Sequence, residues 1–304
     1  MSTERPLGAG GETLISRELL RDWPLPAPGE SKEARGRTLV VGGTAHTPGA
    51  VLLAGEAVLR AGAGKLQIAT AAPVAAALAV AVPEARVVPL PTDDDGNIAE
   101  SAADPVLELA EQADAVLVGS GFSSPDPTVA LLERVLPHMD RPIVVDAVGS
   151  AYVTTHQEGL RHLEGRGILS LNPTEIALTL GISEDELAGD PLGCTRKLAA
   201  VTGTVVILGG EGKLVADPDG TVWVTRAGGP GLGVSGSGDV QAGIVAGLFA
   251  RGAEPAQAAC WAAHLHGLAG EQLAKEQAAV GFLAREISPC VPALLAQYGP
   301  GPTA

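Results

Sequence analysis

Residues 227–251 read AGGPGLGVSGSGDVQAGIVAGLFAR, a glycine-rich loop that runs directly into an apolar helical stretch. The loop holds six glycines between Gly228 and Gly238 and ends in one carboxylate, Asp239. A helix that begins there points unpaired N–H groups and a partial positive charge into the loop, and glycine lets a ligand come close to the backbone. The pattern predicts an anion site, and phosphate is the usual anion. Asp239 can hold a metal or accept a proton from an attacking hydroxyl.

The alternative for Asp239 is an ordinary carboxylate in the first turn of a helix, where it interacts favourably with the helix dipole. Six glycines within 11 residues exceed what helix capping needs, so the sequence favours a ligand site.

Outward from this loop, short apolar strands alternate with helical stretches over most of the chain. Strands are expected at 38–41, 66–69, 86–90, 115–118, 143–145, 167–171 and 205–208, with a hairpin at 213–216 and 222–225. Helices are expected at 16–22, 49–61, 74–82, 105–112, 127–136, 174–180, 191–201, 238–250, 255–274 and 282–295. This alternation predicts an α/β fold of three layers, with a mainly parallel central sheet and helices on both faces.

Composition limits the class of protein further. The chain has 304 residues with 46% hydrophobic and 3% aromatic residues, so its core is expected to consist of Ala, Val, Leu and Ile. We predict a partly ordered N-terminal arm at residues 1–35 and one domain at 36–304. The net charge of −15 argues against binding to nucleic acid or to an anionic membrane.

The cysteines and the N-terminus bear on location. Cys194, Cys260 and Cys290 are too few and too widely spaced for a disulfide framework or a metal site. They indicate a reducing compartment, and no signal peptide is recognisable. The apolar tract 68–82 is too short to span a bilayer. A cytoplasmic protein is therefore expected.

Polar and glycine-rich segments follow the predicted strands, where ligand sites of parallel sheets gather. They are Gly42-Gly43, residues 119–124, Asp146, residues 172–175 and residues 209–213. Asp146 is equally compatible with structural hydrogen bonding and with a role in a site. His264 and His266 are two residues apart and face different sides of a helix, which favours structural roles over joint metal binding.

Two of these segments have plain structural alternatives. In Asn172-Pro173-Thr174-Glu175, Asn172 or Thr174 can cap a helix with Glu175 in its first turn; alternatively, Glu175 lies beside a metal or its waters. The segment Gly209-Gly210-Glu211-Gly212-Lys213 can be a flexible loop with a solvated lysine, or Lys213 can reach a phosphate.

Several segments together resemble the ADP-dependent NAD(P)H-hydrate dehydratases of the ribokinase-like superfamily, between about residues 36 and 274. They are GRTLVVGGTAHTPGAVLLAGEAVLRAGAGKLQIAT, DAVLVGSGFSS, PIVVDAVGSA, NPTEIALTLG, VVILGGEGKLVADPDGTVWV, GGPGLGVSGSGDVQAGIVAGLFARG and HLHGLAGE. The RAGAG turn at residues 60–64 and the GSGD loop are the most specific. The N-terminal arm looks like that of stand-alone forms without an epimerase domain.

The resemblance implies a repair enzyme that dehydrates the 6-hydroxy adduct of NADH or NADPH and uses ADP as phosphoryl donor. We also expect Mg²⁺, because the phosphates are otherwise poorly neutralised. It implies that Asp239 is the catalytic base, that Gly238 contacts AMP, and that Ala50, Gly121 and Asn172 join Asp239 at the hydrate. The nucleotide would bind at Gly209, Gly210, Glu211, Gly212 and Lys213, with Glu175 indirectly at the metal. A homo-oligomer, expected to be a tetramer, is also implied.

Three positions depart from the family pattern. Asn172 and Thr174 stand in a segment that is usually His-Pro-Gly-Glu, Gly209 stands where a Lys is usual, and Gly229 replaces an Asn. Lys213 is a candidate substitute for the missing Lys. Two other functions suit the same motifs: a small-molecule kinase of the superfamily, which would release a phosphorylated product, and a nucleotide-binding protein without activity.

Overall fold

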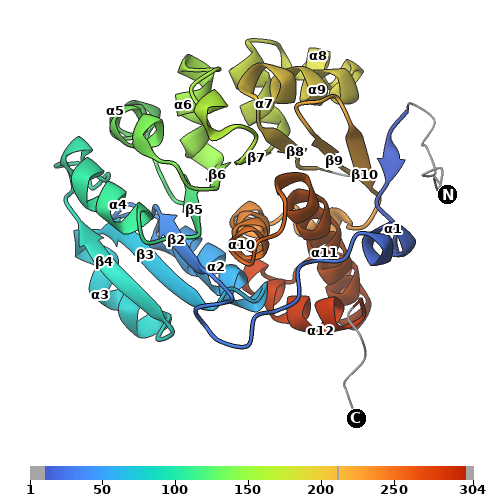
Figure 1. Ribbon diagram of the computed structural model, residues 1–304, viewed down its shortest axis with the longest axis horizontal. Helices are drawn as coiled ribbons and strands as arrows, with labels where there is room; N and C mark the ends of the chain where they lie inside the picture. The colour runs from blue at the N-terminus through green and yellow to red at the C-terminus, as the bar shows by residue number, and fades with distance from the viewer. Residues whose placement is uncertain (1–10, 211, 299–304) are drawn as a thin grey trace.

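One mixed sheet forms the centre of the computed structural model, which describes residues 11–210 and 212–298 (Figure 1). Among these residues, ten strands pair in the order β1-β10-β9-β8-β7-β6-β5-β2-β3-β4. Their bounds are β1 Thr13–Leu14, β2 Arg37–Val41, β3 Lys65–Ala71, β4 Ala85–Leu90, β5 Ala115–Val118, β6 Ile143–Asp146, β7 Gly167–Leu171, β8 Val205–Leu208, β9 Lys213–Ala216 and β10 Val222–Thr225. Only β9 runs antiparallel to its neighbours, so the predicted mainly parallel sheet and hairpin are confirmed.

Helices cover both faces of the sheet because alternate strand residues point to opposite sides (Figure 1). Val40 and Ile207 join one core with α2 Pro48–Arg60, α3 Ala72–Ala81, α10 Ser237–Ala250, α11 Pro255–Glu276 and α12 Val291–Ala296. Leu39 and Val206 join the other core with α4 Ala103–Ala110, α5 Pro125–Val135, α6 Ser150–Thr155, α7 Pro173–Leu180, α8 Glu184–Gly189 and α9 Pro191–Thr202. The predicted three layers are therefore present.

The predicted helix at 282–295 is wrong. That segment forms two short 3₁₀ turns, η6 Ala284–Glu286 and η7 Ser288–Cys290, followed by α12. Pro289 and Pro292 lie in the first turns of η7 and α12, where their missing N–H groups are tolerated; inside one long helix each proline would remove a hydrogen bond. The sequence pattern did not predict β1, α6 or α8.

Close packing against α2 positions α10 beneath the centre of the sheet. A Cβ added at Gly243 would overlap the carbonyl oxygen of Ala54, and one added at Gly247 would lie 2.5 Å from that of Val58. Only glycine permits this approach of the two backbones. Helix α10 also contacts β5 and β6, and its first residues share a cavity wall with residues at the carboxyl ends of β6 and β7.

Residues 11–35 pack along the domain rather than away from it. β1 pairs with β10, and the helix α1, Arg17–Asp22, follows it. The Trp23 ring stacks on Trp223 with 5.8 Å between centroids, and Trp261 donates a 3.0 Å hydrogen bond to the Trp23 carbonyl. The boundary predicted after residue 35 stays a prediction, and residues 1–10 of the predicted arm lie outside the described part.

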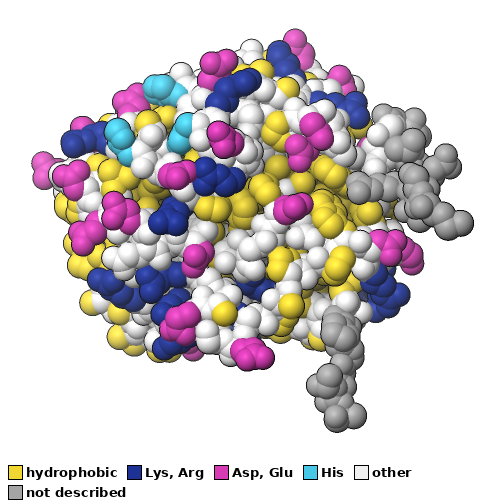
Figure 2. Space-filling model, in the orientation of Figure 1, with side chains coloured by type: hydrophobic (Ala, Val, Ile, Leu, Met, Phe, Trp, Pro, Cys, Tyr) yellow, Lys and Arg dark blue, Asp and Glu magenta, His cyan; other side chains and the backbone are white. Residues whose placement is uncertain are grey.

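On the face shown in Figure 2, acidic and basic side chains are interspersed, without a continuous basic surface. Across the described residues, no helix is both long enough and apolar enough to cross a membrane.

Candidate active site

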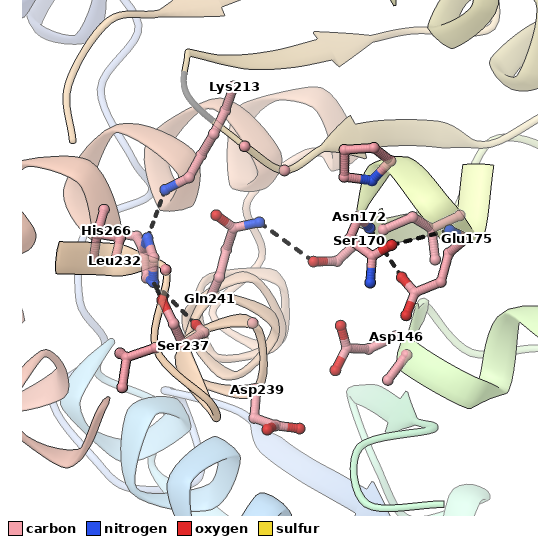
Figure 3. Close-up of a pocket in the computed structure, with 18 of the residues that line it drawn as sticks. Asp146, Ser170, Asn172, Glu175, Lys213, Leu232, Ser237, Asp239, Gln241 and His266 are labelled. Carbon is pink, nitrogen blue, oxygen red and sulfur yellow. Dashed lines mark hydrogen bonds between the residues drawn. The ribbon is translucent and has the colours of Figure 1, made fainter. Parts of the chain in front are cut away.

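A cavity of about 570 Å³ opens where β6, β7 and β8 end and α10 begins (Figure 3). Its wall is formed by residues that follow these strands, by the glycine-rich loop at residues 229–234, and by side chains of β9, α10 and α11. This volume is in the range of small-molecule sites. The glycine-rich loop and the residues that follow the predicted strands therefore share one cavity.

Asp239 lies in the first turn of α10 and faces the cavity. The turn into this helix is made by Gly236, whose φ is +89°; a Cβ at this residue would also lie 2.5 Å from Leu53. Burial raises the pKa of the half-buried Asp239 carboxyl, while hydrogen bonding by Ser120 and by its own main-chain N–H opposes the rise. A carboxylate with a raised pKa is a better proton acceptor than an ordinary aspartate.

Asp146 ends β6 and is buried in the cavity wall. The Ser120 hydroxyl donates a 2.8 Å hydrogen bond to its Oδ2. Burial, followed by the charge of Asp239, raises the pKa of Asp146 well above the usual range, and Glu175 adds to the effect. Both interpretations of Asp146 thus apply, since it is hydrogen-bonded and it lines the site.

Asn172 and Glu175 form the helix cap that the sequence allowed. The Asn172 side chain accepts a 2.9 Å hydrogen bond from the Glu175 main chain, and Glu175 Oε2 accepts one of 2.9 Å from the Asn172 main chain. Both residues also line the cavity (Figure 3). Burial raises the pKa of Glu175, with a smaller contribution from Asp239. The cap directs a third carboxyl into the site.

The segment after β8 is only partly as predicted. Gly209 and Gly210 line the cavity, Gly212 lies outside its wall, and Glu211 lies outside the described residues. Lys213 is not a solvated lysine: it is 4% exposed, lines the cavity and points toward His266 (Figure 3). Burial lowers the pKa of Lys213 to about 7.

The predicted substrate residues Ala50 and Gly121 lie together beside this cavity rather than in its wall. A Cβ added at Gly121 would lie 2.9 Å from that of Ala50. Hydroxyls of Thr44, Thr47 and Ser123 form a hydrogen-bonded group around them. Ser120, which precedes Gly121, connects this region to Asp239 through its hydrogen bond.

Four polar residues of the cavity were not predicted as site residues from the sequence: Ser170, Ser237, Gln241 and His266. Gln241 donates to Ser170 Oγ over 3.4 Å, which joins α10 to β7. His264 instead contacts the Thr225 hydroxyl at 2.9 Å, so the two histidines have different partners. Of these four residues, only Ser237 could have been predicted from the sequence, because it lies inside the GSGD loop.

No three His, Cys, Asp or Glu side chains of residues 11–210 and 212–298 are grouped as a metal site. Mg²⁺, however, is usually bound by one or two carboxylates together with substrate phosphates. Asp146, Glu175 and Asp239 all have raised pKa values, and a cation among them would relieve their repulsion. The residues present therefore fit a nucleotide-bound Mg²⁺.

The fold is that of ribokinase-like proteins. A ribokinase-like superfamily protein from Enterococcus faecalis superposes with a TM-score of 0.83 at 23% identity, covering 97% of this chain and 99% of that one. The predicted fold class is thereby confirmed.

Within this superfamily, the model of the NAD(P)H-hydrate dehydratase family matches residues 38–293, and the chain belongs to that family. An ADP-dependent (S)-NAD(P)H-hydrate dehydratase from Xanthomonas campestris is 45% identical over 92% of this chain and 95% of its own length. The ADP/ATP-dependent enzyme from Bacillus subtilis, co-crystallised with ATP/Mg²⁺, gives a TM-score of 0.77 at 25% identity over 98% and 100% of the two chains. The chain spans about half of the bifunctional repair enzyme from Escherichia coli, at 32% identity over 92% of this chain and 52% of that one.

Proposed function

We propose that this protein is an ADP-dependent (S)-NAD(P)H-hydrate dehydratase that returns hydrated NADH or NADPH to the working cofactor, and that Asp239 is its catalytic base. The observation that supports this most directly is the position of Asp239, at the mouth of α10 and in the same cavity as Gly209 and Gly210. A phosphate at the helix start and a substrate hydroxyl beside Asp239 would meet there.

The reaction proceeds in two balanced steps. The oxygen of the substrate 6-hydroxyl attacks the terminal phosphorus of ADP while Asp239 accepts the hydroxyl proton. The phosphoryl group is thereby transferred to the substrate, and AMP leaves. Loss of phosphate from C6 and of a proton from C5 then restores the double bond of the dihydropyridine. Main-chain N–H groups at the start of α10 stabilise the charge on the transferred group. The raised pKa of Asp239 favours acceptance of the hydroxyl proton.

The remaining site residues support binding. A Cβ added at Gly238 would have no atom within 4 Å, so the backbone there is open to AMP. Gly209, Gly210 and Lys213, which line the cavity, border the nucleotide. Ala50, Gly121 and Asn172 contact the hydrate. Mg²⁺ would be held indirectly by Glu175 together with the phosphates, and it would supply charge neutralisation.

The test is incubation of the purified protein with (S)-NADHX, ADP and Mg²⁺, while the ultraviolet absorbance of reduced nicotinamide is followed and AMP and phosphate are quantified. Recovery of NADH with equal AMP and phosphate supports the proposal. A stable phosphorylated product would indicate a kinase instead. Bound ADP without turnover would indicate a nucleotide-binding protein. ATP in a parallel reaction identifies the preferred donor, and NADPHX the preferred substrate.

Free thiols and an exposed apolar helix bear on the location and the assembly of the protein. Cys194 and Cys290 are free thiols, which supports a reducing compartment, the cytoplasm. The exposed side of α3 has no charged residue, and its Val80 is 82% exposed, which supports self-association as a homo-oligomer with a tetramer as the first expectation. Light scattering coupled to gel filtration tests the assembly.

A further inference from the structure

Three buried side chains in the cavity wall form a continuous hydrogen-bonded chain from three different elements. Lys213 Nζ of β9 lies 2.5 Å from His266 Nδ1 of α11, and His266 Nε2 lies 3.0 Å from Ser237 Oγ of α10. All three are at most 5% exposed, and Figure 3 shows them side by side. The function proposed above gives no role to His266.

The direction of these hydrogen bonds follows from a main-chain oxygen. His266 Nε2 also lies 3.0 Å from the Ser237 carbonyl oxygen, which can only accept. Nε2 therefore bears the proton, and Nδ1 is the acceptor for the Lys213 amine. Because the protonated Nε2 cannot accept a hydrogen bond, the proton of the Ser237 hydroxyl is directed away from His266, and Ser237 lines the cavity.

The charge of Lys213 and its surroundings suit an anionic ligand. Among the described residues, which exclude Glu211, no ion pair includes Lys213. Its other contact is the Ala263 carbonyl at 3.4 Å. Burial and Lys213 together hold the pKa of His266 well below its usual range, so this ring stays neutral and keeps its tautomer. An amine buried without a counterion is costly, and phosphates entering the cavity would provide one.

We propose that Lys213 and His266 are positioning residues that hold the Ser237 hydroxyl as a donor to the nucleotide phosphates. This inference rests on the nucleotide site of the proposed function. It changes the role first expected of Lys213, because the lysine acts through His266 instead of reaching the phosphate itself. The lysine is thus supplied by β9, which pairs with β8. Gly209, at the end of β8, has no side chain to offer.

The experiment measures ADP affinity by calorimetry for Lys213→Met, Ser237→Ala and the double variant. We expect Lys213→Met to weaken ADP binding by about 10- to 100-fold, the range for loss of a hydrogen bond with a charged group. The double variant should lose less than the product of the two single losses, since both changes interrupt one chain. Lys213→Gln, which keeps an N–H donor for His266, should retain more affinity than Lys213→Met.

Controls separate positioning from folding. Lys197→Met removes an exposed lysine of α9 and should leave ADP affinity unchanged, and adenosine, which has no phosphate, should bind all variants alike. The inference would be overturned if the two losses of ADP affinity multiplied in the double variant, or if Lys213→Gln and Lys213→Met lost equal ADP affinity. It would also be overturned if the variants lost affinity for adenosine to the same extent. A wild-type protein that binds ADP without dehydrating the hydrate would refute only the proposed function; one that does not bind ADP would refute both.

Discussion

The hydroxyl of Ser120 donates a 2.8 Å hydrogen bond to Oδ2 of Asp146, and the same hydroxyl interacts with Asp239. One hydroxyl proton serves one carboxylate at a time, so the two acids compete for it. Glu175 adds a third carboxyl whose pKa burial raises. The cavity therefore concentrates acids that are costly to ionise together, and such clusters are typical of sites that bind cations and move protons.

The first prediction concerns Asp239. Asp239→Asn preserves the shape of the side chain but cannot accept the hydroxyl proton, so turnover should fall by about 10²- to 10⁴-fold. ADP affinity should be unchanged or higher, because a negative charge near the phosphates is lost. Steady-state kinetics and calorimetry measure the two effects. Asp126→Asn, an acid in the first turn of α5, is the matched control and should retain full activity. Near-normal turnover in Asp239→Asn would refute the base assignment.

The second prediction concerns the pH dependence of stability. The folded-state pKa of Asp146 is raised, so the folded protein binds this proton more tightly than the unfolded chain does. The free energy of unfolding therefore decreases as pH rises from about 4, the unfolded value, through the folded-state pKa. Asp146→Asn removes this penalty and should raise Tm at pH 8 by roughly 2–4 °C for each kcal/mol gained. Thermal melts should show this difference shrinking toward pH 4.

An opposite trend provides the control. A hydrogen bond and the charge of Arg166 lower the pKa of the exposed Asp140, so its contribution is present above the unfolded pKa and is lost as pH falls. Asp140→Asn should slightly lower Tm at neutral pH and match the wild type in acid. If both variants shifted Tm in the same direction, the raised folded-state pKa assigned to Asp146 would be wrong.

The third prediction uses two matching capping boxes. Asn172 and Glu175 begin α7 inside the cavity, whereas Ser183 and Glu186 begin α8 outside it. Asn172→Ala and Ser183→Ala should each cost about 0.5–2 kcal/mol of stability, measured by urea unfolding. Only Asn172→Ala should also reduce turnover, by roughly 10- to 100-fold, because the Asn172 side chain is the one proposed to contact the hydrate. Equal activity in the two variants would reduce Asn172 to a structural cap.

The sequence predicted the parts of the site that depend on local pattern. Asp239 and the capping box at Asn172 were recognisable because a helix start and its cap lie within a few neighbouring residues. The burial of Lys213 was not, since its partner His266 is 53 residues away and is placed by the packing of α11 over β9. Strand β1, with two residues, is too short for a periodic pattern.

The last prediction is that Gly238→Ala lowers ADP affinity without lowering the stability of the protein. Its backbone φ is not in the left-handed region, and a Cβ added there would have no atom within 4 Å, so Gly238→Ala should fold normally and can gain about 0.5–1 kcal/mol of helix stability. The added methyl would project where a phosphate approaches the backbone N–H groups, so ADP affinity should fall by about tenfold or more. Gly189→Ala in α8 has equal free space but lies outside the cavity, and it should leave affinity unchanged. Calorimetry and thermal melts of both variants make the comparison, and unaltered ADP binding by a well-folded Gly238→Ala protein would show that the nucleotide does not contact this turn of α10.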